Sequence, residues 1–185
     1  MSSFFFAFIA ALLIGQGARD QLLVARMARE TGYGILLAGW VAAIASALFM
    51  AWAGATIAAI LPTSARHMLV GFALLAAAVE LAWPNKEKAL AEPTYSTFAA
   101  LLVLLARQLG DASRFAIFAL AAATALPGLS GVGGALGGGV AVTVGWVMGD
   151  TLTKEVPLRA FRLALAAITF GAGIFIALTA RGLIG

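Results

Sequence analysis

Apolar residues form long runs along this chain, separated by short stretches that are polar or contain proline. The runs cover 4–29, 33–60, 65–83, 95–124, 127–148 and 158–181. A helix of about 20 apolar residues spans the hydrocarbon core of a bilayer. The prolines fall at or near the ends of the runs, where their missing N–H group does least harm to a helix. The pattern therefore predicts an all-α, polytopic integral membrane protein with six transmembrane helices.

Composition agrees with a membrane protein. The chain is 63% hydrophobic and only 11% charged, whereas a soluble domain carries about 25% charged residues. It has no cysteine, which excludes disulfides and thiolate metal sites. We expect no enzyme activity and no cofactor, because the sequence has no HExxH motif, phosphate-binding glycine loop or Ser-His-Asp set. The net charge of +4 is scattered over helix ends, so the expected partner is the lipid bilayer and not nucleic acid.

The chain divides into two similar halves. A polar connector at 85–94 separates a first unit, 1–84, from a second unit, 95–185, and each unit contains three of the predicted helices. Gly17 and Gly110 align at an offset of 93 residues, each after an apolar run and before an alanine-rich helix. Three helices in a half give the second half the opposite orientation. We therefore expect two inverted three-helix repeats, an arrangement whose transport sites lie near the membrane midplane.

The distribution of basic residues predicts the orientation. Lysines and arginines concentrate on one side, around the first, third and fifth connections, which places that side in the cytoplasm and both termini outside. We expect the bacterial inner (plasma) membrane, because the short chain shows no targeting extension. The basic residues on the cytoplasmic side are Arg26, Arg29, Lys86, Lys88, Lys154, Arg159 and Arg162, and those on the other side are Arg66 and Arg181.

Two clusters place charge inside predicted membrane helices, at 15–21 and 107–114. Ionisable groups at membrane depth are costly, so they usually face the bundle interior and mark a pathway or a site. On a continuous helix Arg107 and Arg114 are at i−4 and i+3 from Asp111, and both are expected to reach it. The candidate pathway residues are Gln16, Asp20, Gln108, Asp111 and Ser113, and the candidate charge-tuning residues are Arg19, Arg107 and Arg114.

These clusters resemble the signature of a known transporter family. Membrane cation–proton exchangers related to the Golgi manganese and calcium transporter, in the lysine-exporter superfamily, carry Glu-x-Gly-Asp-(Lys/Arg)-(Ser/Thr), often followed by Gln, in their first and fourth helices. The residues that match are Gly17, Arg19 and Gln21 in the first cluster and Gly110, Asp111 and Ser113 in the second. The residues that depart from the signature are Gly15, Ala18 and Asp20 in the first cluster and Gln108, Ala112 and Arg114 in the second.

The resemblance implies exchange of a divalent cation, Mn²⁺ or Ca²⁺, for protons. It makes Asp111 the main cation ligand and proton carrier and the tentative metal ligand, with Asp20 as a secondary acid. The neutral oxygen ligands would be Gln16, Gln108 and Ser113. The arginines of the clusters would tune the electric field of the site or block it.

Three hypotheses remain open, because the clusters hold two acids against three arginines. The first is a cation exchanger with an altered site. The second is a transporter of an anionic or zwitterionic small solute that an arginine fork would hold. The third is a non-transporting member of the family, in which Arg and Asp pair and lock the halves together.

Two further features give expectations about packing and exposure. The run 127–148 contains small-xxx-small pairs at Gly133/Gly137 and Gly134/Gly138, which predict close packing against another helix. The same face could mediate a homodimer. Glu80 precedes the end of the third run, and we expect it to be exposed at the membrane interface.

Overall fold

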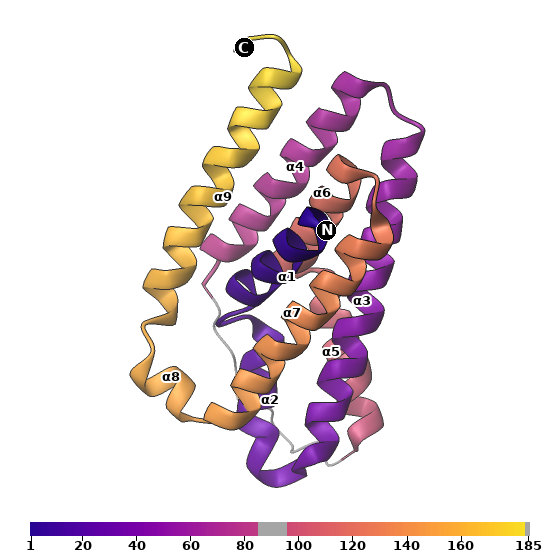
Figure 1. The fold of residues 1–185 in the computed structure, drawn as a ribbon. Coiled ribbons are helices and arrows are strands. Elements are labelled where there is room, and N and C mark those ends of the chain that lie inside the picture. Colours follow the sequence, from indigo (N-terminus) through magenta and orange to yellow (C-terminus); the bar gives the residue numbers. More distant parts are fainter. Residues whose placement is uncertain (85–95, 184–185) are drawn as a thin grey trace.

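The computed structural model describes residues 1–84 and 96–183, and Figure 1 shows its helices. These residues form helices and no strand. The predicted connector 85–94, with Lys86 and Lys88, lies outside the described residues. The helices are α1 (Ser2–Ile14), α2 (Arg19–Thr31), α3 (Tyr33–Ala59), α4 (Thr63–Ala82), α5 (Thr97–Leu109), α6 (Ala112–Thr124), α7 (Pro127–Met148), α8 (Thr151–Glu155) and α9 (Leu158–Ala180).

Four of the predicted membrane helices are confirmed as long apolar helices. Helices α3, α4, α7 and α9 are each long and apolar enough to cross a membrane. Their outer surfaces carry large apolar side chains that the protein leaves exposed, among them Trp52, Phe72 and Phe170. Exposed aromatic surface of this kind is suited to contact with lipid and not with water.

The runs 4–29 and 95–124 were expected as single helices, and that expectation is wrong. The first run is divided into α1 and α2, which meet at an angle of 64°. The second is divided into α5 and α6, each of 13 residues. Counting α1 and α2 as one bent span, the described helices provide up to five candidate spans. The first run breaks where Gly17 takes a φ of 71°, a left-handed conformation that glycine adopts without strain. The second run breaks where Asp111 leaves the helical conformation, with a φ of −84° and a ψ of 145°.

Helices of the two halves interleave in the bundle. Helix α3 packs along α7, and α4 packs along α9. Helix α1 lies against α7, while α5 and α6 lie against α3. Each broken helix is therefore held by the long helix of the other half. Gly17 at the first break and Asp111 at the second are buried, while Leu109 and Gly110 at the second break are exposed.

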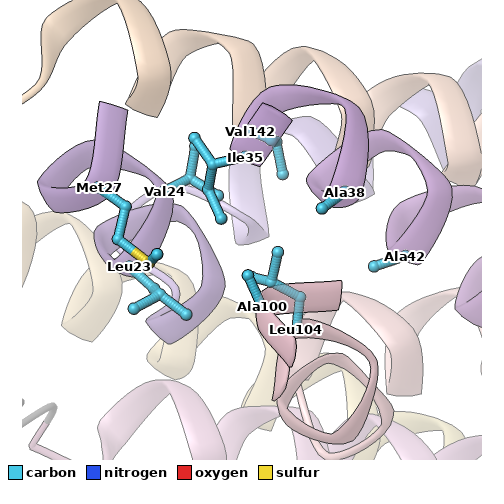
Figure 2. Close-up of a cluster of buried hydrophobic side chains, with 9 residues drawn as sticks. All are labelled: Leu23, Val24, Met27, Ile35, Ala38, Ala42, Ala100, Leu104 and Val142. Atoms are coloured by element: carbon cyan, nitrogen blue, oxygen red, sulfur yellow. The ribbon is translucent and has the colours of Figure 1, made fainter. Parts of the chain in front are cut away.

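An apolar cluster packs the helices beside the two breaks. Its side chains come from α2 and α3 in the first half and from α5 and α7 in the second, as Figure 2 shows. Its alanines lie on α3 and α5, and small residues of this kind let helix backbones approach closely in lipid. The cluster consists of Leu23, Val24, Met27, Ile35, Ala38, Ala42, Ala100, Leu104 and Val142.

The glycine face of α7 packs closely inside the chain, as predicted. A methyl group at Gly137 would lie 3.0 Å from Cβ of Ala11 in α1, and one at Gly138 would lie 3.0 Å from Nη2 of Arg114 in α6. These glycines therefore allow α7 to contact both the first helix and a buried guanidinium. A homodimer remains a prediction.

Candidate functional site

The second helix break is organised by Asp111. This residue is the N-cap of α6, and its Oδ2 accepts a hydrogen bond from the backbone N of Ser113 at 3.0 Å. The Ser113 hydroxyl donates to the same oxygen. Because the helix ends between them, Arg107 lies on α5 and Arg114 on α6. The expectation that both share one helix face with Asp111 is therefore wrong.

The first break is closed by Gln21. Its Oε1 accepts from the backbone N of Gly17 at 2.7 Å, and its Nε2 donates to Gln16 Oε1 at 2.9 Å. The same Nε2 donates to the carbonyl of Ala141 in α7 at 2.7 Å. Gln16 itself donates to Leu12 O at 3.0 Å. Gln16 therefore helps to stabilise the backbone at this break.

Gln108 joins the two breaks. Its Nε2 donates to Oδ2 of Asp20 at 2.7 Å. Its Oε1 accepts from Ser46 Oγ at 2.8 Å and from Arg114 Nη2 at 3.1 Å. Gln108 is fully buried, so these bonds lie out of reach of water. A side chain from the end of α5 thus holds a carboxylate from the start of α2.

Arg114 supplies a positive charge to this buried cluster. It is 1% exposed. Its Nε donates to Ser46 Oγ at 2.7 Å, and its Nη1 donates to Ser113 Oγ at 3.3 Å. Asp20 and Asp111 both lie within electrostatic reach of the guanidinium. A buried cation is tolerated only when it is paired and hydrogen-bonded in this way.

A cavity of about 390 Å³ lies beside the cluster. Asp20 and Asp111 line it, although both are buried, and so do Arg19, Arg107 and Glu80. The structure therefore brings five of the predicted site residues together in this cluster: Asp20, Gln108, Asp111, Ser113 and Arg114. Gln16 does not line this cavity, and the described lining consists of Arg19, Asp20, Glu80, Val103, Ala106, Arg107, Gly110 and Asp111.

Glu80 and Arg162 are site residues that the sequence analysis missed. The expectation that Glu80 is exposed is wrong, because its side chain is only 12% exposed and its Oε2 lies 2.9 Å from Arg162 Nη2. Arg162, which was expected near the membrane surface, is 3% exposed. One signal could have found Glu80, namely an acid inside an otherwise apolar run, which by itself suggests a site.

The site offers few ligands to a metal ion. Within residues 1–84 and 96–183, no group of three or more His, Asp or Glu side chains is placed to hold one. The side-chain oxygens of Gln108 and Ser113 are already hydrogen-bonded to the protein. A divalent cation at Asp111 would therefore depend on Asp20 and Asp111 together with water oxygens.

Comparisons of the chain with protein-family models, with curated proteins and with solved structures found no match. The class of protein is therefore defined by its fold and its site alone. Across residues 1–84 and 96–183 the protein is all-helical, with several helices that could cross a membrane. A buried ionic cluster lies where two of the apolar runs are broken.

Proposed function

We propose that this protein is a secondary transporter that exchanges a small cation for protons, by alternating access around the two helix breaks. The observation that carries the proposal is the hydrogen bond from Gln108 to Asp20, which unites both breaks in one buried cluster beside a cavity. Broken helices that meet at a shared ionic site are typical of secondary transporters. The proposal includes six spans, with α5 and α6 together forming one of them.

The halves correspond closely enough to support inverted repeats. Helices α2 (Arg19–Thr31) and α6 (Ala112–Thr124) are offset by 93 residues at both ends. Gln21 and Arg114 have the same offset, and each reaches back to its own break, at Gly17 and at Gln108. Helix α1 packs on α7 as α5 packs on α3. Under this correspondence Asp111, the N-cap of α6, is equivalent to Ala18, the N-cap of α2.

The buried charges favour exchange of a cation for a proton. Asp20, Asp111 and Arg114 together carry one negative charge when both acids are ionised. A net charge is unfavourable in a poorly hydrated interior, so one proton or one monovalent cation makes the cluster neutral, whereas a divalent cation changes its net charge from −1 to +1. Arg19 and Arg107 line the same cavity but are more exposed, where water and salt weaken their effect. Occupancy by either a cation or a proton is what exchange requires.

Each predicted residue has a role in this scheme. Asp111 and Asp20 carry the cation and the proton, because carboxylate oxygens suit hard cations such as Mn²⁺ and Ca²⁺. Gln108 and Ser113 position the two carboxylates through hydrogen bonds. Arg114 sets the net charge. All three of its side-chain nitrogens donate to protein side chains, which argues against its use as the fork that holds an anionic substrate.

The test is flux in proteoliposomes that contain a pH-sensitive dye. Gradients of Mn²⁺, Ca²⁺, Na⁺ and K⁺ are applied one at a time. We expect at least one of them to drive proton movement in the opposite direction, and we expect Asp111→Asn to abolish it. Asp150→Asn is the matched control, because Asp150 is a partly exposed acid that pairs only loosely with Arg29, at 3.8 Å.

Two outcomes would overturn the proposal. Proton movement that Asp111→Asn leaves unchanged would remove Asp111 as the carrier. The absence of flux with every cation tested would favour the hypothesis of a non-transporting protein whose charged residues lock the halves together.

A further inference from the structure

A second cavity, of about 330 Å³, lies beside the first helix break. Gly17 and Leu22 line it from the first half, and Thr153, Arg159 and Arg162 line it from the second. Among the described residues that line it, two are arginines and none carries a carboxylate. The first cavity differs, because three acids and two arginines line it.

Arg162 has unused hydrogen-bond donors at this cavity. Its Nη2 donates to Oε2 of Glu80 at 2.9 Å and to the Glu80 carbonyl at 3.2 Å. Its Nε and Nη1 are buried and have no hydrogen-bond partner within the described part of the chain. Leaving a buried charged donor unsatisfied costs about 1–3 kcal/mol or more. Such a group in the wall of a cavity points to a ligand with acceptor oxygens.

The backbone nearby is shaped to hold Arg162 in place. A Cβ atom at Gly17 would lie 3.2 Å from Cδ of Arg162 and 3.2 Å from Cβ of Leu158. Glycine at this position thus lets the arginine stem lie against the first break. Arg162 also lies in the second turn of α9, whose N-cap Pro157 offers no side-chain hydrogen bond. The positive end of the helix dipole therefore adds to the attraction for an anion.

We propose that this second cavity binds a phosphate group through Arg162, with Arg159 contributing from the more exposed side. The phosphate would come either from inorganic phosphate in solution or from the headgroup of an anionic lipid. Nη1 and Nη2 form one fork of the guanidinium, which matches two phosphate oxygens. The two arginines compensate the charge of the phosphate, since no acid lines this cavity within the described residues.

Glu80 competes with the phosphate for Arg162. Its carboxylate holds Nη2, one of the two nitrogens of the fork. Glu80 also lines the first cavity, so the ion pair between Glu80 and Arg162 lies between the two cavities. Replacing Glu80 by glutamine removes the competing charge. A phosphate site at Arg162 therefore requires Glu80→Gln to tighten phosphate binding, whereas a purely structural ion pair gives no such effect.

The experiment is titration calorimetry on the full chain purified in detergent, with two probes in separate arms. One probe is inorganic phosphate, and the other is a water-soluble short-chain phosphatidylglycerol. We expect Glu80→Gln to tighten binding by about tenfold, equivalent to about 1.4 kcal/mol. We expect the double variant Glu80→Gln/Arg162→Gln, which leaves no unpaired charge, to lose binding by at least about tenfold. Arg159→Gln should weaken it severalfold, and Arg181→Gln, at the far end of α9, should not change it.

Each outcome of the titrations either supports or overturns the phosphate site. Binding of inorganic phosphate identifies a solute site, and binding of the lipid alone identifies a headgroup site; either one supports the proposal. If the double variant binds as tightly as Glu80→Gln alone, or if neither probe binds even to Glu80→Gln, the proposal is overturned. Asp111→Asn should leave phosphate binding intact, so a failure here and a failure of cation exchange can be told apart.

Discussion

Replacing Gln108 by leucine is expected to uncouple the two helix breaks. The substitution keeps a fully buried side chain of similar size but removes the hydrogen bonds to Asp20 and Arg114. Both partners are ionisable, and a hydrogen bond to a charged group contributes about 1.5–3 kcal/mol. The loss is therefore expected to reach about 3–6 kcal/mol, a large part of a typical total stability of about 5–15 kcal/mol.

The coupling between Gln108 and Asp20 is measured by a double-mutant cycle with Gln108→Leu and Asp20→Ala. An ordinary interhelical hydrogen bond in a membrane protein gives a coupling of about 0.6 kcal/mol. A bond to a carboxylate at 2.7 Å should give about 1.5–3 kcal/mol. The assay is equilibrium unfolding of the purified chain in mixed micelles by sodium dodecyl sulfate, followed by far-ultraviolet circular dichroism.

Gln16→Leu is the matched control, since the Gln16 side chain bonds to neutral partners among the described residues, Gln21 and the Leu12 carbonyl. It should cost much less than Gln108→Leu and should show no coupling to Asp20. The reasoning is refuted if the Gln108–Asp20 coupling is no larger than about 0.6 kcal/mol, the value of an ordinary interhelical hydrogen bond. Equal losses for the two leucine variants would refute it as well.

Three more results are expected. Gly138→Ala places a methyl group 3.0 Å from Arg114 Nη2 and should destabilise the protein by about 1–3 kcal/mol in the same unfolding assay. Gly128→Ala is the control: a methyl group there meets no neighbouring atom within 4 Å, so the change should be neutral or stabilising. Asp111→Asn should abolish exchange but preserve the melting temperature, because asparagine caps a helix as well as aspartate does. Asp111→Ala should abolish exchange and also lose about 1 kcal/mol of stability. Equal stability of the two variants would contradict the capping role. Saturating phosphate should tighten cation binding severalfold in the native protein, because phosphate displaces the Glu80 carboxylate from Arg162 and leaves its negative charge to act on the first cavity. Calorimetry on Glu80→Gln should show no such change.

The long apolar helices could be predicted from the sequence because their signal is local. The run 127–148 coincides with α7, and the run 33–60 nearly coincides with α3. Length and apolar content are sufficient to identify a helix that can cross a bilayer. The two charged clusters could also be located, since charge is rare at such depth.

The geometry of the breaks could not be predicted in the same way. The polar residues showed where each apolar run is interrupted, but not that Gly17 leaves the helical conformation or that Asp111 begins a new helix as its cap. With a continuous helix assumed, Arg114 was expected to reach Asp111 along one face. Its actual hydrogen bonds to Ser46 and Gln108 depend on how α3 and α5 pack, which the sequence pattern does not specify.

The pair Glu80 and Arg162 shows the same limit. Both residues lie near the ends of apolar runs, where charged side chains usually reach the aqueous interface. Their burial follows from the contact between α4 and α9, which turns the two side chains towards each other. A contact between helices that are far apart in the sequence leaves no trace in the local pattern of either one.

The most direct test of the central claim is the release of protons when a cation binds. The purified protein, in weakly buffered detergent solution with a pH dye, is titrated with the cation that supports flux in proteoliposomes. If Asp20, Asp111 and Arg114 form a cluster that holds either a cation or a proton, each cation bound should release about one proton, and Asp111→Asn should release none. Cation binding without proton release, or equal release from the native protein and Asp111→Asn, would contradict the account.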